Sequence, residues 1–171
     1  LARPLGAVGA VSHLLPLIYL LLDDANTNVR LSVIYCFGEF LEIVGVHCAE
    51  DEADGVAGGG CSSDGDGSLV ELLRGLGSDS NWRVRHAALL QLPTLARLLS
   101  PDEFEKLKFN LDAFATDRCA LVRMDLLKVC ARVAELPGYG RPWVERTALP
   151  VLIARHAEAK NYERRAVLLE G

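Results

Sequence analysis

Aromatic residues are scarce in this chain, and closely spaced cysteine pairs are absent. Phe, Trp and Tyr make up 6% of the 171 residues, whereas half of the residues are hydrophobic, with Leu, Ala and Val predominating. That usage is typical of packed helices rather than of β-sandwiches. The five cysteines, at 36, 48, 61, 119 and 130, are odd in number and well separated. A reduced, cytoplasmic or nuclear protein therefore fits better than a disulfide scaffold.

An excess of basic residues and a long apolar run are also missing. The net charge of −5 and the pI near 5.4 disfavour nucleic acid as a partner, because its binding requires dense Lys and Arg. The apolar run over 14–22 is far shorter than a membrane span of ~20 residues, so we expect no membrane association. The alternative of a secretory signal lacks a small-residue cleavage site after that run. The chain starts without Met, and we expect the native protein to continue on both sides.

Catalytic and metal-binding motifs are absent as well. The four His residues, at 13, 47, 86 and 156, are scattered, so no Ser or Cys has a predicted base beside it; His86 is expected to be solvated. A calcium loop at Asp64 and Asp66 would place Leu73 where a Glu is required. A zinc site would have to use His47, Cys48 and Cys61, and the sequence has no second pair of closely spaced ligands to complete it. We predict neither enzymatic activity nor a bound metal or cofactor.

A short motif does recur along the chain. An acidic or small residue is followed six positions later by Arg, usually with Val just before the Arg. The pairs are Asp24 and Arg30, Asp79 and Arg85, Asp117 and Arg123, and the degenerate Ala159 and Arg165. The Arg residues are 55, 38 and 42 positions apart, and the two shorter spacings match the period of HEAT and armadillo repeats. The longest spacing becomes regular if about 16 residues are an insertion.

We place this insertion at 46–67. The segment is rich in Gly and acidic residues and lacks Lys and Arg, and we expect it to be a mobile loop.

Apolar residues keep the same register after each motif. Relative to Val29, Val84 and Val122, they recur at offsets of four, eight and eleven, which mark one face of an α-helix. The second helices of the hairpins are therefore predicted over 27–45, 81–99 and 119–136, and a fourth begins near 161. The capping-box run at 100–103 predicts the first helix of repeat three over 101–115. Kinks are expected at the prolines inside predicted helices, which are Pro16, Pro93 and Pro150.

Each predicted hairpin has one apolar face that it cannot bury alone. Stacking against neighbouring hairpins buries these faces and places the second helices on the inner surface. We therefore predict an all-α fold, an α-solenoid of about four HEAT repeats in a right-handed superhelix, as a single segment over 1–171. The repeats are expected at approximately 5–45, 68–99, 100–136 and 140–171, with the acidic insertion at 46–67.

Individual residues also resemble a known family. The matching runs are His13-Leu14-Leu15-Pro16-Leu17, Asn28-Val29-Arg30-Leu31, Ile43-Val44-Gly45, Asn81-Trp82-Arg83-Val84-Arg85, and Asn161-Tyr162 with Arg165. They resemble the scaffold, or A, regulatory subunit of protein phosphatase 2A. The resemblance covers nearly the whole chain apart from the insertion, and it runs in the order of about repeats ten to thirteen of that family's fifteen.

The resemblance implies a non-catalytic scaffold whose turns within the repeats grip the phosphatase catalytic subunit. A regulatory B-type subunit would join on N-terminal repeats of the full-length protein. Trp82, Arg83 and Tyr162 match the family's catalytic-subunit contacts, and Asn161 belongs to the same motif as Tyr162. Ala120 stands where the family usually has an aromatic residue, so the grip could be weaker or differently aimed there.

The residues point to the same surface without the resemblance. Trp82, Ala120 and Tyr162 each lie two positions before the Val or its equivalent, about 200° around the helix, and so face away from the buried stripe. An exposed aromatic beside Arg83 is the composition of an interface anchor; the alternative is that Trp82 merely covers its turn.

The Asp and Arg residues of the motif are predicted to be structural. Stacking would set them side by side as a ladder of ion pairs along the turns, made by Asp24, Arg30, Asp79, Arg85, Asp117 and Arg123. A second hypothesis for the function stays open. In it the chain is another HEAT-repeat adaptor, for transport or assembly, that uses its concave surface or its acidic insertion to recognise a basic partner.

Overall fold

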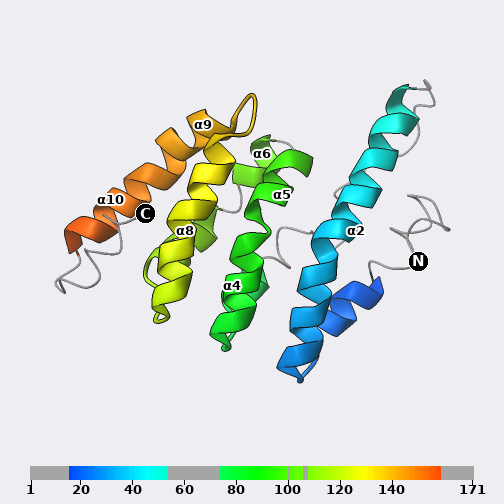
Figure 1. Cartoon of the computed structure of the whole chain (residues 1–171), viewed down its shortest axis with the longest axis horizontal. Coiled ribbons are helices and arrows are strands. Elements are labelled where there is room, and N and C mark those ends of the chain that lie inside the picture. Colours follow the sequence, from blue (N-terminus) through cyan, green and yellow to red (C-terminus); the bar gives the residue numbers. More distant parts are fainter. Residues whose placement is uncertain (1–15, 54–73, 100, 106–107, 159–171) are drawn as a thin grey trace. The chain divides into compact units, whose positions relative to one another are not determined.

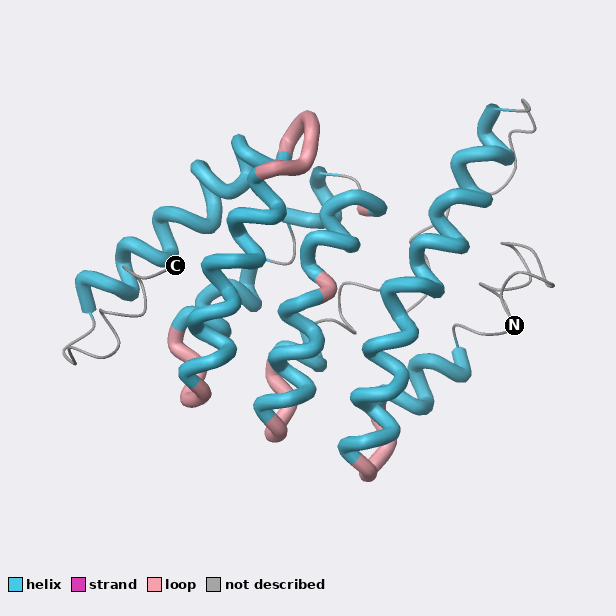
Figure 2. The backbone as a smooth tube through the Cα atoms, viewed as in Figure 1, coloured by secondary structure: helices cyan, strands magenta, loops and turns pink. Residues whose placement is uncertain are grey.

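The computed structural model describes residues 16–53, 74–99, 101–105 and 108–158, and every regular element within these ranges is a helix (Figures 1 and 2). The predicted all-α fold is therefore confirmed. The chain divides into two compact units, Leu1–Leu72 and Leu73–Gly171, and each is described by itself. The right-handed superhelix and the single array over 1–171 stay predictions.

The described part of the first unit, residues 16–53, forms one helical hairpin. Helical residues 16–22 are joined by a short turn to α2 (Thr27–Ala53). Leu22, Ile34 and Phe37 are buried, and the ring of Phe37 stacks on that of Phe40 with centroids 6.2 Å apart. The predicted second helix over 27–45 is thus present, with the expected residue Phe37 at its buried face.

Helix α2 is longer than predicted. It continues to Ala53. The prediction that residues 46–67 form a loop is therefore wrong for residues 46–53. The physical reason is that the sequence contains no proline in this stretch, and the acidic residues at 50–52 are compatible with a helix. The Gly-rich part of the predicted insertion starts at Gly55 and lies outside the described residues.

The second unit is built from stacked hairpins in two layers. One layer consists of the second helices, which are α4 (Trp82–Leu90), α5 (Leu92–Leu98) and α8 (Ala120–Ala134). The other consists of the first helices, which are residues 74–77, α6 (Pro101–Glu105), α7 (Lys108–Ala115), α9 (Gly140–Trp143), the π-helical turn η1 (Val144–Ala148) and α10 (Leu149–Glu158). Helix α8 packs against α4, α5 and α7, and α7 packs against α10 (Figure 1).

The core of the second unit follows the predicted register. In α4 and α5 the stripe residues Ala88, Leu92 and Leu95 are buried, and Leu126 and Val133 are buried in α8. Cys130, the remaining stripe residue of α8, is also buried. Its burial raises the pKa of the thiol to about 12, so the thiol stays protonated and unreactive. The apolar repeat therefore encodes the helix packing.

Two of the three proline predictions fall on described backbone. Pro93 lies in the first turn of α5, where the helix is interrupted at Gln91, so the predicted bend in the second helix of repeat two is present. Before Pro150 the backbone widens into the π-helical turn over 144–148, because proline has no N–H to continue the α-helical ladder. Pro16 is the first described residue of its helix, so the kink predicted there lies outside the described residues.

Candidate protein-binding site

The turn before each second helix is built in the same way three times. The side chains of Asp24, Asp79 and Asp117 accept a hydrogen bond from the backbone N–H two residues later, at 2.7, 2.7 and 2.8 Å. The Arg six positions after each Asp then donates from Nη1 to the carbonyl oxygen of that Asp, at 2.7, 2.8 and 2.6 Å. These residues are Arg30, Arg85 and Arg123. The six-residue spacing of the motif thus closes each turn on itself.

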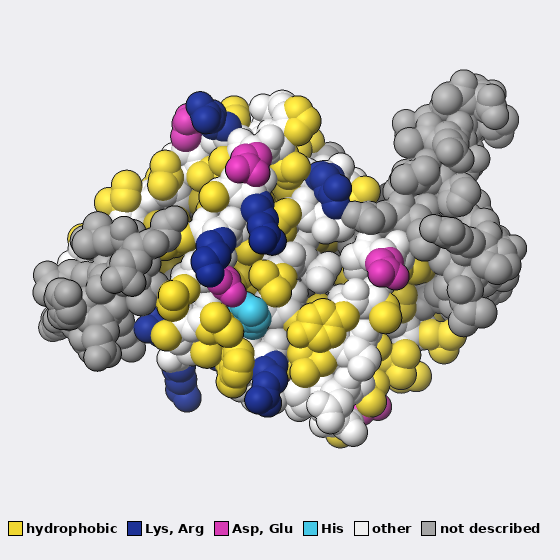
Figure 3. All heavy atoms as spheres, in the orientation of Figure 1, with side chains coloured by type: hydrophobic (Ala, Val, Ile, Leu, Met, Phe, Trp, Pro, Cys, Tyr) yellow, Lys and Arg dark blue, Asp and Glu magenta, His cyan; other side chains and the backbone are white. Residues whose placement is uncertain are grey.

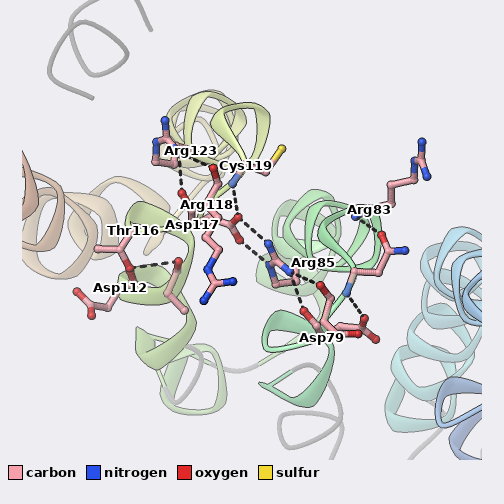
Figure 4. A network of polar contacts seen from close by, with 12 residues as sticks. Asp79, Arg83, Arg85, Asp112, Thr116, Asp117, Arg118, Cys119 and Arg123 are labelled. Carbon is pink, nitrogen blue, oxygen red and sulfur yellow. Dashed lines mark hydrogen bonds and ion pairs between the residues drawn. The ribbon is translucent and has the colours of Figure 1, made fainter. Parts of the chain in front are cut away.

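Arg85 also reaches the turn of the next hairpin. Its Nε and Nη2 donate to the two carboxylate oxygens of Asp117 at 2.6 and 2.7 Å (Figure 4). The side chain of Asp117 is 3% exposed and that of Arg85 is 15% exposed. This pair is the arrangement that the predicted ladder requires; the ladder along all of the turns stays a prediction.

The environment of Asp117 keeps its carboxylate ionised. Burial, the largest single effect, acts to raise the pKa of Asp117. The hydrogen bonds from Arg85 and from the backbone N–H of Cys119, with the charges of Arg85 and Arg123, together outweigh burial and lower that pKa below its ordinary value. The hydrogen bond with Asp117, and then the negative charge of Asp117, raise the pKa of the Arg85 guanidinium against the opposing effect of burial.

Arg123 has a different environment at the following turn. It donates to the carbonyl oxygens of Asp117 and Arg118 at 2.6 and 3.3 Å. Its Nε is buried and has no hydrogen-bond partner within the described part of the chain. The motif supplies Ala159 where the next Asp would be, outside the described residues, so the sequence offers no carboxylate at that position of the motif.

Trp82 and Arg83 lie together at the start of α4. The side chain of Asn81 caps this helix by accepting a hydrogen bond from the N–H of Arg83 at 2.9 Å. The Arg83 guanidinium is 5.3 Å from the centroid of the Trp82 ring, and the Arg83 side chain is exposed and points away from the polar network of the turns (Figure 4). Trp82 is partly buried, so it covers part of its turn while offering its remaining surface beside a cation.

The other predicted contact residues are only partly placed. Ala120 is exposed and begins α8, at the position equivalent to Trp82. Its small side chain leaves that helix start without an aromatic. Asn161 and Tyr162 lie outside the described residues, so the predicted line of aromatic tips stays a prediction.

A polar link between α4 and α8 was missed from the sequence. His86 Nε2 lies 2.7 Å from Asp125 Oδ2, with side chains 17% and 15% exposed, so the prediction that His86 is solvated is wrong. Lys128 Nζ donates to the other oxygen of Asp125 at 2.8 Å. The hydrogen bond from Lys128, and then that from His86, lower the pKa of Asp125 against the opposing effect of burial. A comparison of residues 39 positions apart, close to the repeat period, could have found this link.

The first-helix layer has polar links of the same kind. Arg155 on α10 donates from Nε to Asp112 on α7 at 2.6 Å, and Thr147 on η1 lies 3.2 Å from a carboxylate oxygen of Glu105 on α6. Both links join neighbouring hairpins, so side-chain contacts tie the repeats together in both layers of this unit.

No clustering of potential metal ligands occurs in the part of the chain that the structure describes. Over the same ranges, no helix has the length and apolar character needed to cross a membrane. The cysteines at 36, 119 and 130 are unpaired thiols.

Comparison with known proteins identifies two of the hairpins. Residues 14–44 and 69–99 match the family model of the HEAT repeat. The first match includes helical residues 16–22 and the start of α2, and the second includes residues 74–77 with α4 and α5. No curated protein matches the chain. Two segments of the chain, residues 14–44 and 69–99, are therefore similar to HEAT repeats, in agreement with the helices described there.

Proposed function

We propose that this chain is a non-catalytic scaffold that binds another protein through the turns of its HEAT repeats, and that its partner is the catalytic subunit of protein phosphatase 2A. The observation that carries the proposal is the pairing of Trp82 with Arg83 at the start of α4, where the guanidinium lies 5.3 Å from the ring centroid. Trp and Arg are among the residue types enriched at interface hot spots. The resemblance of Asn81-Trp82-Arg83-Val84-Arg85 to the phosphatase scaffold supports the choice of partner.

The neighbouring turn makes this pair a rigid binding element. Asp79 and Asn81 each bond a backbone N–H of the turn, at 2.7 and 2.9 Å, and Arg85 bonds its carbonyl oxygens. Because the turn is already ordered, binding costs little additional conformational entropy. The mechanism is therefore display of preformed contacts, with no chemical step in the chain itself.

The same proposal extends to the rest of the assembly. Tyr162, with Asn161, is the second aromatic contact, and the exposed Ala120 between the two is a site of weak contact. A regulatory B-type subunit binds elsewhere in the full-length protein, and the complex is cytoplasmic or also nuclear.

The alternative is a HEAT-repeat adaptor for a basic partner. Its support is the acidic composition of 46–67. The second helices of the second unit are a poor surface for a basic partner. Their exposed side chains include Arg83, Lys128 and Arg132, which would repel it.

A pull-down with purified phosphatase catalytic subunit tests the proposal. The tagged chain is compared with Trp82→Ala and with the control Ile153→Ala, which removes an exposed apolar side chain (65% exposed) on α10. We expect the wild type and the control to retain the catalytic subunit and Trp82→Ala to lose most of it. Full retention by Trp82→Ala would remove the proposed anchor, and no retention by any of the three would favour the adaptor.

A further inference from the structure

The outward face of α8 carries a stripe of side chains that the core and the turns do not use. Leu121 and Met124 are 40% and 37% exposed, Lys128 is 59% exposed, and Arg132 is exposed. Their spacing of three, four and four residues places them along one side of the helix. We call these four residues the α8 stripe.

The charges around the α8 stripe are mostly positive. The carboxylate of Asp125 is already held by His86 and Lys128, and Glu135 is the C-cap residue just after the helix. Arg83 is exposed on the adjacent helix α4, which α8 packs against. Figure 3 shows Lys and Arg side chains among hydrophobic ones on this face of the second helices. The ion pair of Lys128 with Asp125 leaves Arg132 and Arg83 as the cations that make this face slightly basic, in a chain whose net charge is −5.

We propose that the α8 stripe is the docking site for an acidic amphipathic helix of a partner protein. Its apolar side chains would cover Leu121 and Met124, and its carboxylates would lie near Lys128 and Arg132. Charge complementarity selects this partner, because a basic segment would meet two like charges on the stripe. The proposal goes beyond the function proposed above, since the stripe contains neither Trp82 nor Arg83.

The existing contacts prepare the α8 stripe for such a partner. The Asp125 carboxylate holds the Lys128 ammonium at 2.8 Å, so this cation is positioned before binding. The His86–Asp125 link also fixes α8 against α4. Exposed ion pairs are screened by salt, so the apolar residues are expected to give affinity and the cations to give selectivity and salt dependence.

Fluorescence anisotropy with a designed probe tests this site on the full chain. The probe is a labelled peptide about four helical turns long, with Leu on one face and Glu on the other, and matched probes replace Glu by Gln or by Lys. We expect the Glu probe to bind more tightly than the Gln probe, the Lys probe to bind weakest, and the affinity for the Glu probe to fall as salt rises. Equal affinity for the three probes would overturn the proposal.

Variants of the chain locate the probe. The single variant Arg132→Glu and the double variant Lys128→Glu with Arg132→Glu should each weaken binding of the Glu probe by about tenfold or more. Met124→Asp should also weaken it. Arg141→Glu, an exposed charge reversal on α9, is the control and should leave the Kd unchanged. Because Lys128→Glu places a carboxylate beside Asp125, Arg132→Glu alone decides the matter if the double variant does not fold.

The two proposals fail separately. Trp82→Ala should bind the Glu probe like the wild type even where it loses the phosphatase catalytic subunit. An unchanged Kd of Arg132→Glu for the probe would refute the docking site and leave the phosphatase proposal intact. Loss of probe binding in Trp82→Ala, with a helical circular dichroism spectrum retained, would also refute it.

Discussion

Arg85 holds the Asp117 carboxylate with two hydrogen bonds, at 2.6 and 2.7 Å, while its third nitrogen bonds the carbonyl oxygen of Asp79 at 2.8 Å. One guanidinium therefore closes its own turn and reaches the turn of the next hairpin. A Lys could not make both sets of contacts, because its ammonium is a point donor without a planar fork. The pair links two turns at the edge of the unit where α4 begins with Trp82.

Removing the charge of Asp117 tests the strength of this pair. Asp117→Asn should lower the free energy of unfolding by about 3 kcal/mol, because Arg85 then lies partly buried without its anion. Asp112→Asn is the matched control, since Asp112 is also bonded by an Arg at 2.6 Å but is 48% exposed, and it should cost less than about 1 kcal/mol. Urea denaturation followed by circular dichroism measures both. Equal losses in the two variants would contradict the role of burial.

The lowered pKa of Asp117 predicts a loss of stability in acid. A carboxyl whose pKa is lower in the folded than in the unfolded state contributes stability above the unfolded value, near 3.8, and this contribution is lost as the pH falls through the folded value. The wild type should therefore lose more stability than Asp117→Asn between about pH 5 and about pH 2. Urea midpoints at several pH values test this, and parallel curves for the two proteins would show that the shift is absent.

The link between α4 and α8 should contribute less than the Arg85 pair. His86→Ala should cost about 1 kcal/mol, because it removes the 2.7 Å contact with Asp125 between two helices. Lys128→Ala removes a contact within one helix from a side chain that is 59% exposed, and it should change stability by less than about 0.5 kcal/mol. Thermal unfolding of both variants gives the comparison, and a larger effect of Lys128→Ala would reverse this assignment.

Gly140 is required by close packing at the start of α9. A Cβ added there would overlap the carbonyl oxygen of Val133, which is backbone and cannot move aside easily. Gly140→Ala should therefore destabilise the protein by about 2 kcal/mol or more. In Gly75→Ala, where an added Cβ meets nothing within 4 Å, the change should be neutral or stabilising because the residue is helical. Urea midpoints test the pair, and similar midpoints for both variants would rule out the clash.

The helices of this fold were predictable because their determinants are local. The register of Val84, Leu92 and Leu95 predicted the buried stripe, and Pro93 predicted the break between α4 and α5. The end of α2 was not predictable from the repeat period, because the acidic residues after Val46 are compatible with a helix as well as with a loop. That extension to Ala53 overturned part of the predicted loop.

Polar contacts were only partly predictable from the sequence. The recurring motif predicted ion pairs between Asp and Arg of stacked turns, and Arg85 and Asp117 form such a pair. It did not predict that Arg123 would bond the carbonyl oxygen of Asp117 within its own turn, at 2.6 Å. The pairing of His86 with Asp125 carries no sequence motif, because it depends on how two helices lie side by side. The exposure of Trp82 was overestimated for the same reason, since a residue that faces away from its own core stripe can still be covered by neighbouring residues.

The most direct test of the account is the Kd of the chain for the phosphatase catalytic subunit, measured by surface plasmon resonance with and without Trp82→Ala. Loss of a hot-spot Trp costs roughly 2 kcal/mol or more, so the variant should bind at least about 30-fold more weakly than the wild type. An equal Kd for the two proteins, or no binding of the wild type at all, would contradict the proposed scaffold function.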